Sequence, residues 1–348
     1  DRWLRPRFQP DFQPSIALVV PCKGTTDESP ETLRALLANA SPRCRIVIAV
    51  ESEADPACTL GRSLVQDQPH AAVVVAGLAT TCAQMNHNLV AGVAASGDSE
   101  VLVFADADLR PGPAWLKELV LPLSDPSVTA STGFRWPTPG QGGPGVHAHA
   151  HTTMQLYTLF TFACLVSSVG LWGGAMAIRR RDYERLGIDE LWRRTTTPDM
   201  SLSAQLVKTG GRAVLVPTCV TPSDDLIAQP GRVVSWFKRQ CQYLRAHFPG
   251  VWALLLPPVA LLLLLQLWLP FALVLGVVAP DRFAAWAGEA ALLYWLGELL
   301  NGALLGLLGD VPRRGRYLAT LSVFRVIPHL GFVLTSLTRT ILWAGVRY

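Results

Sequence analysis

Charged side chains are scarce in this sequence. Asp, Glu, Lys and Arg together make up 16% of the 348 residues, against about 25% in typical soluble domains. The shortage is uneven, because residues 1–250 have an ordinary soluble composition whereas Leu, Ala, Val and Trp dominate residues 251–348. We therefore expect a soluble part followed by a part that is embedded in a membrane.

A strong charge bias and paired cysteines are also missing. The formal net charge is only +4 and there is no long basic run, so nucleic acid is not an expected partner. The seven cysteines form no C-x-x-C pair and no metal-finger spacing, which favours reduced thiols over a disulfide or zinc framework. The first residues show no secretory signal pattern, and whether a further N-terminal membrane helix exists stays open.

Two short motifs bear on cofactors, and neither supports a site. No G-x-G-x-x-G follows the first predicted strand, where the sequence is PCKG at 21–24, and this argues against a dinucleotide-dependent oxidoreductase. The sequence HAHAH at 147–151 follows a Gly/Pro-rich loop. Alternating histidines point in different directions on a helix, so we do not expect a metal site there.

Strand and helix signals alternate along the first part of the chain. The predicted strands are 15–20, 45–50, 71–76 and 101–105, and the predicted helices between them are 31–40, 56–66 and 81–95. This alternation predicts an α/β domain with a mostly parallel, Rossmann-like sheet. In such sheets ligands bind beyond the carboxyl ends of the strands.

Two aspartates end the fourth predicted strand, in the sequence VLVFADADLRP. Residues i and i+2 of an extended chain point the same way, so Asp106 and Asp108 direct two carboxylates at one point. Carboxylates held together repel one another unless a cation lies between them, and a divalent metal that bridges phosphates meets this need. A polar strand end before a turn is the alternative. Glu51, Glu53 and Asp55 follow the second strand at the same edge and favour the metal.

Two later segments carry candidate site residues. The sequence WGGAMAIRRRDY at 172–183 predicts a small-residue turn, a short strand and a basic exit. The stretch 195–211 predicts a helix that begins at Pro198-Asp199 and ends at Gly210-Gly211. An acid in the first helical turn stabilises the helix dipole, so Asp199 has a structural explanation, and a functional role can coexist with it.

The C-terminal part predicts an interfacial helix and three apolar stretches. Residues 231–249 interleave aromatic and aliphatic side chains with basic ones, which is typical of an amphipathic helix at a membrane interface; a soluble surface helix is the alternative. Residues 251–278 and 284–308 are long enough to span a bilayer. The third stretch, 317–343, contains several polar residues and either crosses or is partly re-entrant.

The basic residues between these stretches predict the orientation of the chain. Arg313, Arg314 and Arg316 lie between the second and third stretches, and by the positive-inside rule they are cytoplasmic. Two crossings from residue 251 return the chain to its starting side. We therefore predict an integral membrane protein whose soluble domain is cytoplasmic, in a bacterial inner membrane or its equivalent.

The order of these motifs resembles the membrane-bound family 2 and 21 glycosyltransferases of GT-A fold, most closely the ceramide glucosyltransferase-like branch. The resemblance covers nearly the whole chain. It is carried by VVPCKG at 19–24, VESEADPA at 50–57, AQMNHNL at 83–89, ADADLRP at 105–111, WGGAMAIRR at 172–180, PDMSL at 198–202, RQCQY at 239–243 and the C-terminal ILWAGVRY. It implies a GT-A domain over 1–230, an interfacial helix over 231–250 and a transmembrane helical region over 251–348.

The resemblance also implies a role for each matching residue. Asp199 would be the general base. Asp106 and Asp108 would hold Mg²⁺ or Mn²⁺ on the diphosphate of a UDP-sugar. The residues Trp172, Gly173 and Gly174 would lie on the acceptor side. The donor-binding residues would be Pro21, Lys23, Glu51, Glu53, Asn86, Asp106, Arg239, Gln242 and Tyr243, with Glu51 and Glu53 near the uracil and ribose and the last three near the diphosphate.

Three positions depart from the family pattern. Ser52 stands where the first acidic motif has Asp, and Pro198 stands where an acid commonly precedes Asp199. Gln242 and Tyr243 replace an Arg and a Trp. Gln donates hydrogen bonds but carries no charge, so it stabilises a diphosphate less than Arg does.

The chemistry that these residues can perform predicts an enzyme. Displacing a nucleoside diphosphate from a sugar requires a cation on the leaving oxygens and a base on the incoming hydroxyl. One base on the opposite face implies a single in-line displacement with inversion. We predict a metal-dependent hexosyltransferase that moves glucose from UDP-glucose, or a close relative, to ceramide, diacylglycerol or a hopanoid.

Two other functions remain as alternatives. A polysaccharide synthase is less favoured, because three apolar stretches are few for a polymer channel and the processive motif is not intact. A catalytically silent membrane scaffold or nucleotide-sugar sensor is the alternative outside the enzymes. Ser52 and Gln242 favour it, whereas the retained Asp106, Asp108 and Asp199 oppose it.

Overall fold

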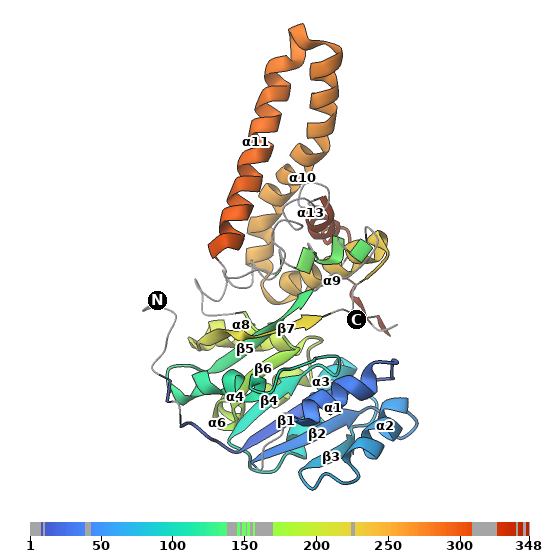
Figure 1. Cartoon of the computed structure of the whole chain (residues 1–348), viewed down its shortest axis with the longest axis vertical. Helices are drawn as coiled ribbons and strands as arrows, with labels where there is room; N and C mark the ends of the chain where they lie inside the picture. The colour runs from blue at the N-terminus through green and yellow to red at the C-terminus, as the bar shows by residue number, and fades with distance from the viewer. Residues whose placement is uncertain are drawn as a thin grey trace. The chain divides into compact units, whose positions relative to one another are not determined.

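The structure is a computed structural model of the whole chain (Figure 1). It describes residues 8–9, 11–38, 43–137, 145–146, 148–150, 152–153, 156, 170–223, 227–307, 326–338, 340–343 and 346–347. The chain divides into two compact units. Unit 1 comprises Asp1–Trp136 and Phe160–Ser223, and unit 2 comprises Pro137–Leu159 and Asp224–Tyr348.

Unit 1 is built on a seven-stranded sheet in the order β3-β2-β1-β4-β6-β5-β7. The strands are β1 Ile16–Cys22, β2 Cys44–Val50, β3 Ala71–Val75, β4 Val101–Ala105, β5 Ala130–Pro137, β6 Ala175–Arg179 and β7 Ala213–Ser223. The pairs β1–β2, β2–β3 and β1–β4 are parallel, whereas β6 runs antiparallel to β4 and β5. The predicted α/β fold with a mostly parallel sheet is confirmed.

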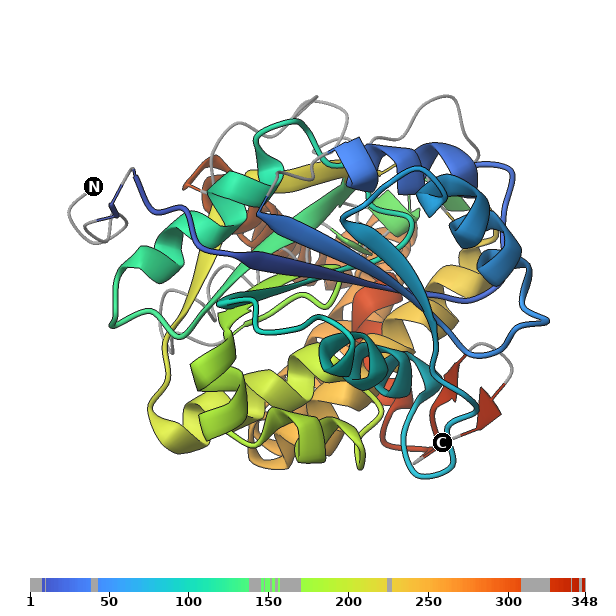
Figure 2. The same cartoon turned by 90° about the horizontal axis from the view of Figure 1, so that it is seen from below.

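Helices cover both faces of this sheet (Figure 2). The helices of unit 1 are α1 Ser29–Ala38, α2 Pro56–Val65, α3 Gln84–Ala94, α4 Trp115–Val120, α6 Arg180–Arg185, α7 Ile188–Trp192 and α8 Pro198–Thr209, with a short 3₁₀ turn, η1, at Leu121–Ser124. On one face, residues of α1, α2 and α4 form a core with the strands. On the other face, residues of α3, α6, α7 and α8 form a second core.

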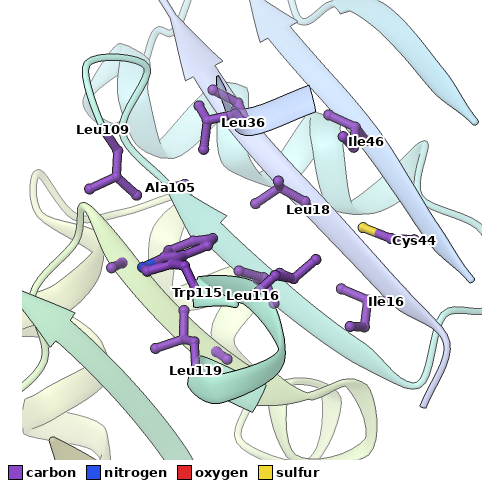
Figure 3. Close-up of a cluster of buried hydrophobic side chains, with 14 of the residues drawn as sticks. Ile16, Leu18, Leu36, Cys44, Ile46, Ala105, Leu109, Trp115, Leu116 and Leu119 are labelled. Atoms are coloured by element: carbon purple, nitrogen blue, oxygen red, sulfur yellow. The ribbon is translucent and has the colours of Figure 1, made fainter. Parts of the chain in front are cut away.

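The buried strands supply apolar side chains to both cores. Successive residues of a strand point to opposite faces, and β1 shows this alternation: Leu18 lies in the core with α1 and α4, whereas Val19 lies in the core with α3. Figure 3 shows Leu18 between Leu36 of α1 and Leu116 of α4. A continuous apolar run such as β1 is therefore required by burial on both faces.

Unit 2 consists mainly of helices. These are α9 Pro230–His247, α10 Pro249–Val278, α11 Pro280–Leu307 and α13 Val326–Leu334, followed by the two short antiparallel strands β8 Leu342–Trp343 and β9 Val346–Arg347. The predicted helix at 231–249 is thus confirmed as α9. Phe237 and Cys241 of α9 pack against Phe332 of α13 in a small buried cluster.

Within the part of the chain that the structure describes, α10 is the one helix that is long and apolar enough to cross a membrane. Its 30 residues extend about 45 Å at about 1.5 Å per residue. The helix α11 matches the second predicted stretch in position, but it also carries Asp281, Arg282 and Glu289 and does not reach the same apolar level.

The third predicted stretch, 317–343, is described only from residue 326 onward and without residue 339. In this described part the only helix is α13, which has nine residues and extends roughly 14 Å, too short to span a bilayer. His329, in the middle of α13, shares a hydrogen bond of 3.0 Å with Gln266 of α10. A polar side chain engaged in this way binds α13 to another helix of unit 2. Residues 317–325 lie outside the described residues.

Candidate active site

The first aspartate of the D-x-D motif is fixed by the pairing of β4 with β6. In this antiparallel pair Ala105 lies opposite Ala175, so the next residue, Asp106, lies beside Gly174. The backbone N–H of Asp106 donates to the Gly174 carbonyl at 3.1 Å. The register therefore brings the Trp-Gly-Gly turn against the D-x-D motif, although the two are more than sixty residues apart in the sequence.

Asp199 is the second residue of α8, after Pro198. Its Oδ2 accepts a hydrogen bond from the Gly173 N–H at 3.0 Å, and its Oδ1 accepts one from the Met200 N–H at 2.7 Å. Burial raises the pKa of Asp199, and these two N–H groups oppose the rise. The helix start and the Trp-Gly-Gly turn together hold the carboxylate in one orientation.

Gly173 and Gly174 separate the two aspartates. A Cβ at position 174 would lie 2.7 Å from Asp106 Oδ2 and 2.3 Å from the Trp172 ring, and one at 173 would lie 3.3 Å from Asp199 Oδ2. Side chains do not approach this closely, so position 174 requires glycine. Two consecutive small residues thus allow the main chain to contact both carboxylates.

The carboxylates of Asp108 and Asp199 both interact electrostatically with the carboxylate of Asp106. The pKa of Asp106 is raised to about 7, first by burial and then by repulsion from Asp108, with a smaller contribution from Asp199. Such a group calls for a cation. The described residues contain no set of three metal-ligating side chains. Two carboxylates nevertheless suit Mg²⁺ or Mn²⁺, because Mg²⁺ commonly takes its other ligands from substrate phosphates and water.

One basic residue at this site was not predicted from the sequence. Arg135 lies in β5, and its Nη2 is 2.6 Å from Asp108 Oδ2. Its guanidinium carbon is 5.7 Å from the centre of the Trp172 ring. The guanidinium also opposes the rise in the pKa of Asp106. Arg135 therefore joins Asp108, a predicted metal ligand, to Trp172, a residue predicted on the acceptor side.

The acidic and basic residues that follow β1 and β2 form three different kinds of contact. Lys23 Nζ lies 2.8 Å from Glu51 Oε2 beyond the carboxyl ends of the two strands. Glu53 is exposed and pairs with Arg62 of α2 at 2.6 Å. Asp55 accepts hydrogen bonds from the N–H groups of Gly24 and Ala57 and caps α2. In this arrangement Lys23 and Glu51 stay together, whereas Glu53 binds a neighbouring helix.

Two of the predicted donor-binding residues, Pro21 and Asn86, are part of the framework of unit 1. Pro21 lies in β1 opposite Ala49 of β2. Asn86 of α3 is fully buried, and its amide nitrogen donates to the carbonyls of Trp192 and Thr195. These bonds tie α3 to the loop that leads into α8, so Asn86 contributes to the placement of Asp199. Direct contact of either residue with a donor stays a prediction.

The remaining predicted donor residues lie on α9 in unit 2. Gln242 is buried there, and its amide nitrogen donates to Thr338 Oγ1 at 3.1 Å and to the Thr340 carbonyl at 2.7 Å. Tyr243 beside it is also buried, and Arg239 lies one turn earlier. Their approach to a diphosphate stays a prediction.

The described histidine of the HAHAH sequence, His149, is engaged within unit 2. Its Nδ1 accepts a hydrogen bond from the Ile227 N–H at 2.9 Å, and its ring meets the Trp236 ring edge-on at 4.5 Å. His147 and His151 lie outside the described residues.

Comparison with known proteins identifies the family. Residues 2–348 match the family model described as Glycosyl transferase family 21. The chain belongs to glycosyl transferase family 21. The resemblance found in the sequence is confirmed for this family, and the protein is a glycosyltransferase. A search of curated proteins gave no match.

The family 21 chain is also similar to solved structures. The mannosyltransferase PcManGT from Pyrobaculum calidifontis, in complex with GDP-Man and Mn²⁺, has 18% sequence identity and a TM-score of 0.55, with 97% of this chain and 91% of that chain covered. Glucosyl-3-phosphoglycerate synthase from Mycobacterium tuberculosis, in complex with Mn²⁺, UDP and phosphoglyceric acid, has 14% identity and a TM-score of 0.43, with 70% and 84% covered. The first likeness shows the shared GT-A fold.

Proposed function

We propose that this family 21 glycosyltransferase is an inverting, metal-dependent hexosyltransferase with a nucleotide-sugar donor and a membrane-lipid acceptor. UDP-glucose is the proposed donor, and the proposed acceptor is a ceramide-like lipid, a diacylglycerol or a hopanoid. The Trp-Gly-Gly turn supports this proposal most directly, because consecutive glycines place Asp106 and Asp199 against neighbouring backbone groups. In this proposal Asp106 serves the donor and Asp199 serves the acceptor.

Asp106 and Asp108 are the residues that would hold Mg²⁺ or Mn²⁺. When bound, the metal would neutralise charge on the leaving diphosphate. The complex of the similar mannosyltransferase with GDP-Man and Mn²⁺ supports a metal and a nucleotide sugar as ligands. Lys23 and Glu51, beyond the ends of β1 and β2, are proposed to lie near the nucleoside.

Asp199 is proposed as the general base. Its carboxylate accepts the proton of the acceptor hydroxyl while the hydroxyl oxygen bonds to the anomeric carbon. The bond from that carbon to the diphosphate oxygen breaks, and the nucleoside diphosphate leaves with the electron pair. A single displacement of this kind inverts the anomeric centre. Asp199 is held in one orientation by the Gly173 and Met200 N–H groups, as positioned general-base catalysis requires.

The acceptor class is proposed from unit 2. The helix α10 is apolar, and leucines such as Leu254 and Leu264 are exposed along it at 75% and 63%. A helix of this kind is expected to lie in the bilayer, where lipid acceptors are found. We propose that unit 1 works on the cytoplasmic side, where the enzyme would meet nucleotide sugars.

UDP release by the purified full-length protein in detergent tests this function. The protein would receive UDP-glucose and a mixed lipid extract, with either Mn²⁺ or EDTA. Release that requires both lipid and Mn²⁺ is expected, and mass analysis would then identify the glycolipid. Binding of UDP without any release, for every common UDP-sugar, would instead support a silent scaffold or sensor. The engagement of the Gln242 amide within unit 2 is the observation that keeps this second candidate.

A further inference from the structure

Arg135 is the basic side chain that contacts the D-x-D motif in unit 1. Its Nη2 lies 2.6 Å from Asp108 Oδ2, and the two side chains are 22% and 47% exposed. The partner is a proposed metal ligand, so the pair is more than an isolated surface salt bridge. A metal held by Asp108 would compete with the Arg135 guanidinium for the negative charge of the same carboxylate.

The ring of Trp172 gives the guanidinium a second support. The guanidinium carbon lies 5.7 Å from the ring centre, within the distance at which a cation is attracted to an aromatic face. Phe134 lies beside the same ring, with 5.6 Å between the two ring centres. Arg135 can therefore leave Asp108 and still remain at the site, because its guanidinium also lies over the Trp172 ring.

The chemistry of a guanidinium fits the ligand that is proposed to arrive. Arg is always charged and presents paired N–H donors that match phosphate oxygens. On α9, Gln242 stands where the family pattern has an Arg. Its side chain is uncharged and donates hydrogen bonds to Thr338 and Thr340. Arg135 offers unit 1 a positive side chain of its own beside the D-x-D motif.

From these contacts we infer that Arg135 changes its ion-pair partner when the donor binds. Before binding it pairs with Asp108, and once Asp108 binds the metal it pairs with the donor diphosphate. This inference rests on the proposed function. It makes Arg135 a donor-binding and positioning residue. It also predicts effects of opposite sign on two ligands, because Arg135 competes with the metal but attracts the nucleotide.

Two binding measurements on the full-length protein in detergent test this exchange. The first measures the Kd of Mn²⁺ in the absence of nucleotide, from the concentration of free Mn²⁺ determined by electron paramagnetic resonance. The second measures the Kd of UDP at saturating Mn²⁺. In Arg135→Gln the Kd of Mn²⁺ alone is expected to fall about threefold, the scale of a partly exposed ion pair. The Kd of UDP is expected to rise about tenfold, the scale of a lost charge-assisted hydrogen bond.

Arg110→Gln is the matched control. Arg110 follows the same motif and forms an exposed ion pair with Glu28 at 2.9 Å, so its removal should leave both constants unchanged. Arg135→Lys keeps the charge but loses the fork of donors, and its UDP affinity should lie between those of the wild type and Arg135→Gln. The Lys variant also provides the test if Arg135→Gln does not fold.

The outcomes separate this inference from the proposed function. A static structural salt bridge predicts that both constants move in the same direction or match the Arg110 control, and either result overturns the exchange. A wild-type protein that binds neither Mn²⁺ nor UDP would instead overturn the proposed function. Wild-type binding of both ligands, with opposite shifts in the Arg135 variants, establishes the exchange.

Discussion

The carboxylate of Asp199 is under two opposing influences. Burial favours its neutral form, whereas the N–H groups of Gly173 and Met200 favour its charged form. A base that is buried yet hydrogen-bonded stays oriented and remains basic enough to accept a proton near neutral pH. The position predicted for Asp199 in the first turn of a helix is confirmed and is compatible with the catalytic role proposed for it.

Replacing this base should separate binding from turnover. In Asp199→Asn we expect transfer to fall by about 10²–10⁴-fold, the usual contribution of a general base. The Kd of UDP at saturating Mn²⁺ should stay unchanged, because the amide keeps the size of the side chain. Asp189→Asn, which removes an exposed partner of Arg193, is the control and should keep full activity. Wild-type turnover in Asp199→Asn, or loss of UDP binding, would rule out Asp199 as the base.

The raised pKa of Asp199 predicts the pH dependence of transfer. The base acts only when deprotonated, so the rate falls as pH falls through its pKa. Because burial raises that pKa, the decline should begin at a higher pH than for an ordinary aspartate, whose pKa is about 3.9. The measurement is kcat against pH at saturating donor and Mn²⁺. A rate that stays constant down to pH 4 would contradict this assignment.

Asp108 should control metal binding. In Asp108→Ala we expect Mn²⁺ affinity, measured without substrates, to fall by at least about tenfold, because a two-carboxylate site loses half of its protein ligands. Transfer should be lost together with its dependence on Mn²⁺. Asp67→Ala, at an exposed position, is the matched control. An Asp108→Ala enzyme that is active and indifferent to EDTA would refute the assignment of the D-x-D motif.

At the scale of elements, the Trp-Gly-Gly turn is the structure on which the site depends. A methyl group at position 174 would meet both the Trp172 ring and Asp106 Oδ2. We expect Gly174→Ala to lower transfer by about 10²-fold, as a displacement of about 1 Å of catalytic groups does. Gly112→Ala is the control, because a Cβ there meets nothing within 4 Å. Equal activity of the two variants would show that the turn adapts.

The elements that the sequence predicted share one physical property: their signals are local. Apolar runs predicted β1 to β4, and Pro198 with Gly210 marked the two ends of α8. The sheet order is not local. The insertion of β6 between β4 and β5 is decided by packing over the whole sheet. The hydrophobic periodicity of the sequence does not predict it.

This difference explains which site residues could be found beforehand. Asp106, Asp108 and Asp199 each stand at a strand end or helix start with a visible local pattern. Arg135 lies within β5, 27 residues from its partner Asp108, and no motif surrounds it. Only the sheet order brings β5 near the D-x-D motif. The sequence signal that could have suggested it is a charged residue in an otherwise apolar and aromatic strand, TGFRWP.

At the scale of the whole molecule, the exposed apolar side chains of unit 2 fit the membrane location proposed for it. Leucines on α10 and α11 are exposed, among them Leu254, Leu264 and Leu299 at 75%, 63% and 68%. Soluble monomers rarely expose contiguous apolar patches of this kind. A bilayer would remove the unfavourable free energy of hydrating these apolar side chains, because lipid tails would cover them instead of water.

The position of charge along α10 tests whether that helix spans the bilayer. The double variant Leu264→Lys with Leu267→Lys places two charges near the middle of the helix, at a cost of about 2.5–3.5 kcal/mol each. We expect the fraction that resists extraction by alkaline carbonate to drop sharply. The control pair, Leu254→Lys with Leu255→Lys, lies near the start of the helix, where lysine can reach the interface, and should remain membrane-integrated. Equal extraction of the two double variants would mean that α10 lies outside the hydrocarbon core.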